Sequence, residues 1–212
     1  MILIGQFDSP FVRRVGITLR HYGVAFEHRP WAVFRDAEKI GALNPVRRVP
    51  TLVLEDGTVL TETFVCLEVL DDLQAGVDAS RLLLPRTGAA RRAGLRTVGF
   101  ATGLADKTVS LIYERVIREQ RSVVWSERCT KQVMGTLQLL ESEFTALQRP
   151  FFLGDQLSHA DIAVSCALTL LRDGLPGWLD PTPFPRLHDL QGRCEALPIF
   201  QQTFQMFDAP LE

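Results

Sequence analysis

Three short segments in the N-terminal third of the chain carry groups that suit a small, charged peptide with a thiol. Ser9 stands directly before a proline and offers a hydroxyl at the start of a predicted helix, where the positive helix end stabilises a thiolate. Val49 precedes Pro50 and offers extended backbone that can pair with a peptide. Glu62 and Thr63 open another predicted helix and offer an acid, a hydroxyl and N–H groups for an amine and a carboxylate. The three segments together predict one ligand site.

Each of these residues also has a plain structural explanation. Serine before proline is a common helix start, and an acid with a hydroxyl suits a first helical turn. Pro50 can simply begin a strand, and Arg48 can be a solvated charge. No motif pairs a histidine base with Ser9, so its hydroxyl is interpreted as a hydrogen-bond donor to bound sulfur and not as a nucleophile. Its place between the first strand and the first helix favours the chemical interpretation.

The first 76 residues must position these segments, and they alternate strand and helix signals. Strands are expected over 2–5, 25–31, 51–54 and 59–60, and helices over 10–22, 36–43 and 64–76. Asp56-Gly57 predicts a tight hairpin between the last two strands. The order βαβαββα predicts a mixed sheet with helices on its faces. Apolar side chains recur at helical spacing in the first helix, so its basic side chains are expected outside, namely Arg13, Arg14 and Arg20.

Beyond residue 76 the pattern changes from mixed to helical. Residues 77–86 are expected to form a linker, and 87–212 an all-helical domain whose first two helices cover 87–119 and 122–147. Ser158 and Asp161 form a variant of the capping box, which predicts a helix that begins directly after Ser158. Prolines at 185 and 198 introduce two more helices.

Charge, apolar runs and the spacing of cysteine and histidine indicate which kinds of partner the protein is not expected to bind. The 212 residues include 23 basic and 25 acidic side chains, so the net charge of −2 offers no general attraction to nucleic acid or to an anionic membrane. Met1–Gly5 is interpreted as a strand and not as a signal peptide, and no apolar run approaches the roughly 20 residues that span a bilayer. The four cysteines and four histidines lack metal-ligand spacing, so no metal is assigned. A cytoplasmic location is expected.

On Ser9-Pro10-Phe11, Arg48-Val49-Pro50 and Glu62-Thr63 the chain resembles a soluble glutathione transferase, and Pro10–Val15 is similar to the bacterial serine-type members. The resemblance covers almost the whole length. It implies a thioredoxin-like domain with a mixed four-stranded sheet over residues 1–76, followed by the all-helical domain. It implies that the thioredoxin-like domain binds glutathione through the residues of the three segments: Ser9, Phe11, Arg48, Val49, Pro50, Glu62 and Thr63.

The same resemblance implies a role for each part of that site. Ser9 would donate to the glutathione thiolate, and Arg48 would meet the glycine carboxylate. A cis Val49-Pro50 bond would turn the backbone of Val49 toward the peptide. Glu62 and Thr63 would hold the γ-glutamyl end.

A pocket for the second substrate is expected on the first long helix, where Thr102, Asp106 and Tyr113 are the candidates. Relatives often carry an acid at the place of Thr102, and it helps to hold the γ-glutamyl end across a dimer. Here the hydroxyl of threonine replaces that acid, and Asp106 lies one turn further on.

The activity implied is attack of the glutathione thiolate on a small, partly apolar electrophile, with glutathione as co-substrate and no further cofactor. The resemblance also implies a homodimer. Two alternatives stay open: a non-catalytic interaction or regulatory protein on the same fold, and a glutathione-dependent isomerase. The absence of cysteine at position 9 counts against thiol exchange but not against isomerisation.

Overall fold

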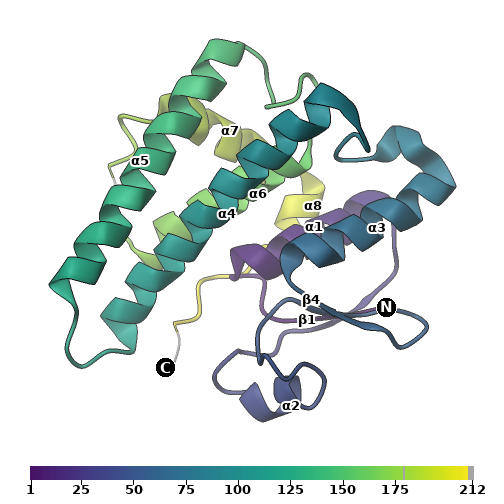
Figure 1. Cartoon of the computed structure of the whole chain (residues 1–212), viewed down its shortest axis with the longest axis horizontal. Coiled ribbons are helices and arrows are strands. Elements are labelled where there is room, and N and C mark those ends of the chain that lie inside the picture. Colours follow the sequence, from purple (N-terminus) through teal and green to yellow (C-terminus); the bar gives the residue numbers. More distant parts are fainter. Residues whose placement is uncertain (179, 210–212) are drawn as a thin grey trace. The chain divides into compact units, whose positions relative to one another are not determined.

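The computed structural model describes residues 1–178 and 180–209 (Figure 1). The chain divides into two compact units. One unit contains Met1–Leu83 together with the C-terminal segment from Pro198, and the other contains Leu84–Leu197. Within the described ranges, no helix is both long enough and apolar enough to span a membrane.

The N-terminal unit is built on a four-stranded mixed sheet. Its elements are β1 (Ile2–Ile4), α1 (Pro10–Tyr22), β2 (Glu27–Arg29), α2 (Ala37–Gly41), β3 (Thr51–Val53), β4 (Val59–Thr61) and α3 (Thr63–Asp78). The strand order is β2-β1-β3-β4, in which β1 pairs parallel with β2 and antiparallel with β3, and β3 pairs antiparallel with β4. The predicted βαβαββα order and the thioredoxin-like fold are therefore confirmed.

Helices α1 and α3 pack side by side on one face of this sheet, while α2 lies on the other face (Figure 1). The core between them includes Leu3, Ile4, Val15 and Leu52, all with no exposed surface. Burying each such side chain contributes about 1.5–3 kcal/mol. Leu3 and Ile4 are consecutive and both buried, so side chains on both faces of β1 are covered.

The expectation that the arginines of α1 lie outside is wrong for two of them. Arg13 and Arg14 are only 2% and 3% exposed. Arg13 Nη2 donates to the carbonyl oxygen of Phe200 at 3.0 Å, and its guanidinium lies 5.5 Å from the centroid of the Phe200 ring. Phe200 belongs to the short helix α8 (Pro198–Gln201), which packs on α1. The face of α1 that carries Arg13 is therefore covered by a segment almost 190 residues away in the sequence. The local spacing of apolar residues cannot predict such a distant contact.

The boundaries near the expected linker also differ. Helix α3 continues through Gly76 to Asp78, and a 3-10 turn follows over Ala79–Arg81. The C-terminal residues from Pro198, expected in the helical domain, belong by their contacts to the N-terminal unit.

The described residues of the second unit form the helices α4 (Gly88–Val116), α5 (Val123–Leu147), α6 (His159–Gly174) and α7 (Pro185–Glu195). Helix α6 is buried along nearly its whole length and packs against α4 and α7, while α5 packs against α4 and α7. A helix that is buried on every side must satisfy the polar groups of its own ends, because water cannot reach them.

The capping box at the start of α6 meets this requirement. Asp161 has no exposed surface, and its carboxylate accepts from the N–H groups of Phe152 and Ser158, both at 2.8 Å, and from the hydroxyl of Ser158. The predicted helix start after Ser158 is confirmed. One buried carboxylate thus satisfies three donors that join α6 to the loop before it.

Replacing Asp161 should therefore destabilise the protein strongly. Asp161→Ala leaves three buried donors without an acceptor, at a cost of at least about 3 kcal/mol in the free energy of unfolding. Asp161→Asn keeps one carbonyl oxygen and should lose less. Urea denaturation followed by circular dichroism would measure both, and an alanine variant as stable as wild type would contradict this account.

Candidate active site

Ser9 lies at the N-terminus of α1, as the sequence predicted. It adopts an extended conformation, and its side-chain oxygen accepts from the N–H of Val12 at a long 3.5 Å. This contact uses a lone pair of the oxygen and leaves the O–H as a donor. Ser9 is half-buried, so the hydroxyl remains accessible beside the positive end of a 13-residue helix.

The loop that carries Val49 passes very close to the end of β1. Gly5 has φ of 125°, a conformation that favours glycine. A Cβ atom at Gly5 would lie 2.6 Å from Val12 Cγ2 and 2.8 Å from Val49 Cβ, both far inside van der Waals contact. The Val49-Pro50 bond is cis, as the family resemblance implies. Glycine at position 5 therefore lets strand, helix and loop meet beside Ser9.

Asn44 holds this loop in place, although sequence reasoning did not identify it. The residue is 3% exposed, and its side-chain nitrogen lies 3.0 Å from three acceptors that share its two hydrogens: the carbonyl of Arg48 and the hydroxyls of Thr51 and Thr61. Its side-chain oxygen accepts from the N–H of Val46, also at 3.0 Å. The only signal in the sequence is the turn-forming Asn44-Pro45 dipeptide, which does not reveal partners on two strands.

Glu62 connects two of the three predicted segments. Its carboxylate pairs with Arg48 at 3.1 Å, and both side chains are 55% exposed. Such an exposed pair adds little stability. The backbone of Glu62 has φ of 67°, which is unusual for a residue with a side chain. The N-cap residue of α3 makes no side-chain hydrogen bond to the helix. The first N–H groups of a helix have no partner within it, and such an end can bind an anion.

Thr63 connects the third segment to the first. It is 5% exposed, and its hydroxyl donates to the carbonyl of Phe11 at 3.2 Å. The hydroxyl was expected to hold a carboxylate of the ligand. In this structure it instead fastens the start of α3 to the first turn of α1. The N–H groups at the start of α3 are then the donors available for that carboxylate.

The C-terminal segment also holds the loop before Ser9, through hydrogen bonds. The side chains of Gln205 and Asp208 accept from the loop: the N–H of Phe7 reaches Gln205 Oε1 at 2.8 Å, and Gln6 Nε2 reaches Asp208 Oδ2 at 2.7 Å. In return, the N–H of Asp208 donates to Asp8 Oδ2 at 3.0 Å. We call Gln205–Asp208 the C-terminal strap. No pattern in the sequence indicates this strap, because its partners lie about 200 residues apart in the chain.

Two carboxyl groups of this contact have pKa values that move in opposite directions. Burial raises the pKa of Asp8, and the nearby charge of Asp208 adds to the shift. Hydrogen bonds from Arg35 and Gln6 lower the pKa of Asp208. Asp8 thus opposes folding when it ionises, whereas Asp208 supports folding when it ionises.

The three second-substrate candidates lie on α4, in the other unit. Their spacing of four and seven residues places Thr102, Asp106 and Tyr113 on one face of that helix. Thr102 and Tyr113 are half-buried, and Asp106 is exposed and paired with Lys107 at 2.8 Å. These three residues therefore lie along one helix, spread over about three turns.

Comparison with protein families agrees with this geometry. Residues 8–73 match the family model of the glutathione S-transferase N-terminal domain, and residues 124–190 match that of the C-terminal domain. The chain belongs to the glutathione S-transferase family. The first match begins at Asp8 and includes all three segments of the candidate site.

Curated relatives of this glutathione S-transferase family member are distant. It is 26% identical to the GST-like protein YibF of Escherichia coli over 186 residues, which is 86% of this chain and 89% of that protein. It is 24% identical to glutathione S-transferase U28 of Arabidopsis thaliana, over 77% of this chain and 69% of that protein.

Solved structures are closer in shape than in sequence. A glutathione S-transferase of Methylobacterium radiotolerans, in complex with glutathione sulfonate, superimposes with a TM-score of 0.89 at 27% identity and covers 100% of this chain and 97% of its own. A family member from Pseudomonas fluorescens with bound glutathione gives 0.82 at 27% identity, covering 95% and 97%.

The opposite pKa shifts of Asp8 and Asp208 predict that Asp8→Asn changes stability in a pH-dependent way. The amide keeps an acceptor for the N–H of Asp208 but cannot ionise. Wild type loses stability as the pH rises through the raised pKa of Asp8, and the variant does not. Asp8→Asn should therefore raise the unfolding temperature near pH 7 and have little effect near pH 3, as differential scanning calorimetry would measure.

Asp208→Asn is the matched control, because the sign of its effect is opposite. The lowered pKa of Asp208 supplies stability at neutral pH that is lost as the pH falls through that pKa. This variant should be slightly less stable than wild type near pH 7 and equal to it in acid. Two variants with the same pH trend would contradict the assigned charges.

Proposed function

We propose that this protein is a glutathione transferase whose N-terminal unit binds glutathione and stabilises its thiolate. The observation that carries the proposal is the convergence of Ser9, Val49 and Glu62 in one unit, joined by the Arg48–Glu62 and Thr63–Phe11 contacts. Glutathione ligands on two structural relatives at 27% identity support the same assignment.

Ser9 acts on the sulfur. A free thiol has a pKa near 8.5, so only a small fraction is ionised at neutral pH. A hydroxyl donor and the positive end of α1 favour the thiolate, while the thiol proton leaves to water. The sulfur then attacks the electrophilic carbon and forms an S–C bond as the displaced electron pair moves onto the leaving group or the adjacent acceptor. Catalysis is thiolate stabilisation and positioning, with no covalent bond to the enzyme.

The remaining groups hold the two ends of the peptide. The N–H groups at the start of α3 take the γ-glutamyl carboxylate, and Glu62 accepts from the neighbouring ammonium. Val49 pairs with the peptide through its backbone, and Arg48 meets the glycine carboxylate. Arg48 and Glu62 already form an ion pair that bridges the two segments.

Further expectations remain predictions. The serine-type subclass, the homodimer and the second-substrate function of Thr102, Asp106 and Tyr113 are inferred from the family resemblance, and a cytoplasmic location is inferred from the sequence pattern. Sedimentation equilibrium would measure the oligomeric state directly.

Glutathione binding should depend on Glu62. Titration calorimetry with reduced glutathione should show binding to wild type, and Glu62→Gln should weaken it about tenfold, because a charge-assisted contact contributes about 1.5 kcal/mol. Glu38→Gln is the matched control, since Glu38 forms a similar exposed pair with Arg47 at 2.6 Å in the same unit. Absence of heat with wild type at millimolar glutathione would leave only a non-catalytic protein.

Ser9→Ala should lower conjugation of a model electrophile by tenfold or more while glutathione binding changes little, because the lost donor acts on the sulfur. The pH–rate profile should shift to higher pH as the pKa of the bound thiol rises. Ser122→Ala controls for loss of a helix cap, because Ser122 caps α5 through the N–H of Trp125 at 3.3 Å. An unchanged rate and pH profile in Ser9→Ala would remove Ser9 from the mechanism.

A further inference from the structure

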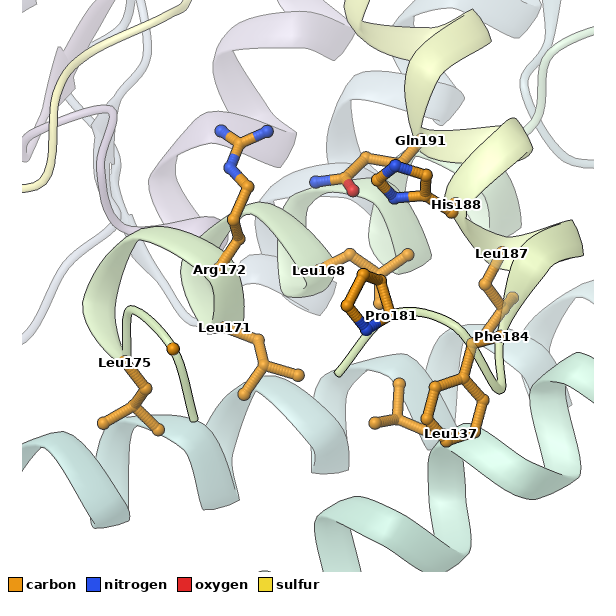
Figure 2. A pocket seen from close by; sticks show the side chains of 11 residues that line it. Leu137, Leu168, Leu171, Arg172, Leu175, Pro181, Phe184, Leu187, His188 and Gln191 are labelled. Carbon is orange, nitrogen blue, oxygen red and sulfur yellow. The ribbon is translucent and has the colours of Figure 1, made fainter. Parts of the chain in front are cut away.

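A cavity of about 160 Å³, partly open to solvent, lies in the second unit, lined by residues of α5, α6 and α7 and by described residues between α6 and α7. Figure 2 shows that the cavity has two chemically different sides. Leucine side chains and Phe184 surround one side, and Arg172, His188 and Gln191 stand together on the other. None of these residues belongs to the proposed glutathione site.

The apolar side comes from side chains that are almost entirely buried. Each has 8% or less of its surface exposed: Leu137, Leu168, Leu171, Leu175, Phe184 and Leu187. An apolar cavity of about 150 Å³ in another protein stays free of water and binds benzene. The volume here therefore suits one six-membered aromatic ring, whose burial would recover dispersion contacts that the cavity walls lack.

The polar side presents a hydrogen-bond acceptor whose orientation is fixed. Thr169 Oγ1 lies 2.7 Å from Glu195 Oε1, and because a carboxylate can only accept, the threonine must donate there. The same hydroxyl must then accept from Gln191 Nε2, which lies 2.9 Å away. The amide oxygen of Gln191 therefore turns away from Thr169. Within residues 1–178 and 180–209, no hydrogen bond to that oxygen is present, although the residue is only 6% exposed.

The charges at the opening favour a neutral ligand. Both Nε and Nη2 of Arg172 are bound to the carboxylate of Asp173, at 2.6 and 2.9 Å. This pair leaves the arginine little net attraction for an anion. The amide oxygen of Gln191 is an acceptor, so it would repel a carboxylate but can accept a hydrogen bond from an O–H group.

We propose that this cavity binds a small phenol. The ring occupies the space among the leucines, and the phenolic hydroxyl donates to the amide oxygen of Gln191. A phenol has a pKa near 10, so it is neutral at pH 7 and keeps that proton. The site lies entirely within the helical unit and is independent of glutathione binding.

The test uses the whole protein with leucine methyl groups labelled with carbon-13. Phenol, toluene and benzoate are titrated to millimolar concentration while the methyl spectrum is recorded. Phenol should shift the methyl signals of Leu168, Leu171 and Leu187 most strongly, and benzoate should shift them least. Phenol shifts absent from these methyl groups would overturn the proposal.

Two variants separate filling the cavity from hydrogen bonding. Leu168→Phe should fill the space and abolish the shifts, whereas Leu43→Phe, an exposed site in the other unit, should not. Gln191→Leu removes the acceptor and should weaken phenol about fivefold, the effect of one neutral hydrogen bond, while toluene binds at least as well as before. Equal phenol affinity in Gln191→Leu and wild type would overturn the assigned hydrogen bond.

Glu62→Gln separates this site from the proposed glutathione site. It should bind phenol as wild type does even though it binds glutathione weakly. Circular dichroism of each variant confirms folding. A phenol affinity that falls in Glu62→Gln would place the ligand at the other site and overturn the proposal.

Discussion

The candidate site depends on the close packing of the Val12 and Val49 side chains against the backbone of Gly5. The end of β1, the first turn of α1 and the loop before β3 meet there, and the space between Val12 and Val49 admits no side chain. This contact brings the loop that carries Val49 against the first turn of α1, which begins directly after Ser9. Asn44 then fixes the loop by its buried amide, and Thr63 joins α3 to α1. The reactive group and the peptide-binding groups are thus positioned by packing and not by the ligand.

The two ligand sites we propose rely on different physics. The glutathione site uses exposed charges and open backbone, which suit a flexible, charged peptide and add little to folding. The cavity in the helical unit uses buried apolar side chains with a single oriented acceptor. A family member with both features can respond to molecules of unlike chemistry through separate parts of its chain.

The sequence predicted what is local. The order of strands and helices, the start of α1 at Ser9 and the capping box at Ser158 and Asp161 each follow from residues a few positions apart. The burial of Arg13, the hydrogen bonds of Asn44 and the C-terminal strap depend on partners far away in the chain, so no local pattern reports them. The three-segment site was predicted because a resemblance to known proteins supplied the long-range pairing. Thr63 shows the limit of that help, since its hydroxyl already has a partner in Phe11.

The strap has a consequence for the order in which the protein is made. The N-terminal unit includes residues from Pro198 onward, which leave the ribosome after the helical unit. Domains usually fold as they emerge, at about 5–20 residues per second. Here the nascent first unit waits roughly ten seconds, during synthesis of the helical unit, before α8 covers Arg13 and Asp208 reaches the loop before Ser9. The fastening of the loop before Ser9 is therefore completed only after the helical unit has been made, and a chain terminated before Pro198 would carry every segment of the candidate site without that fastening.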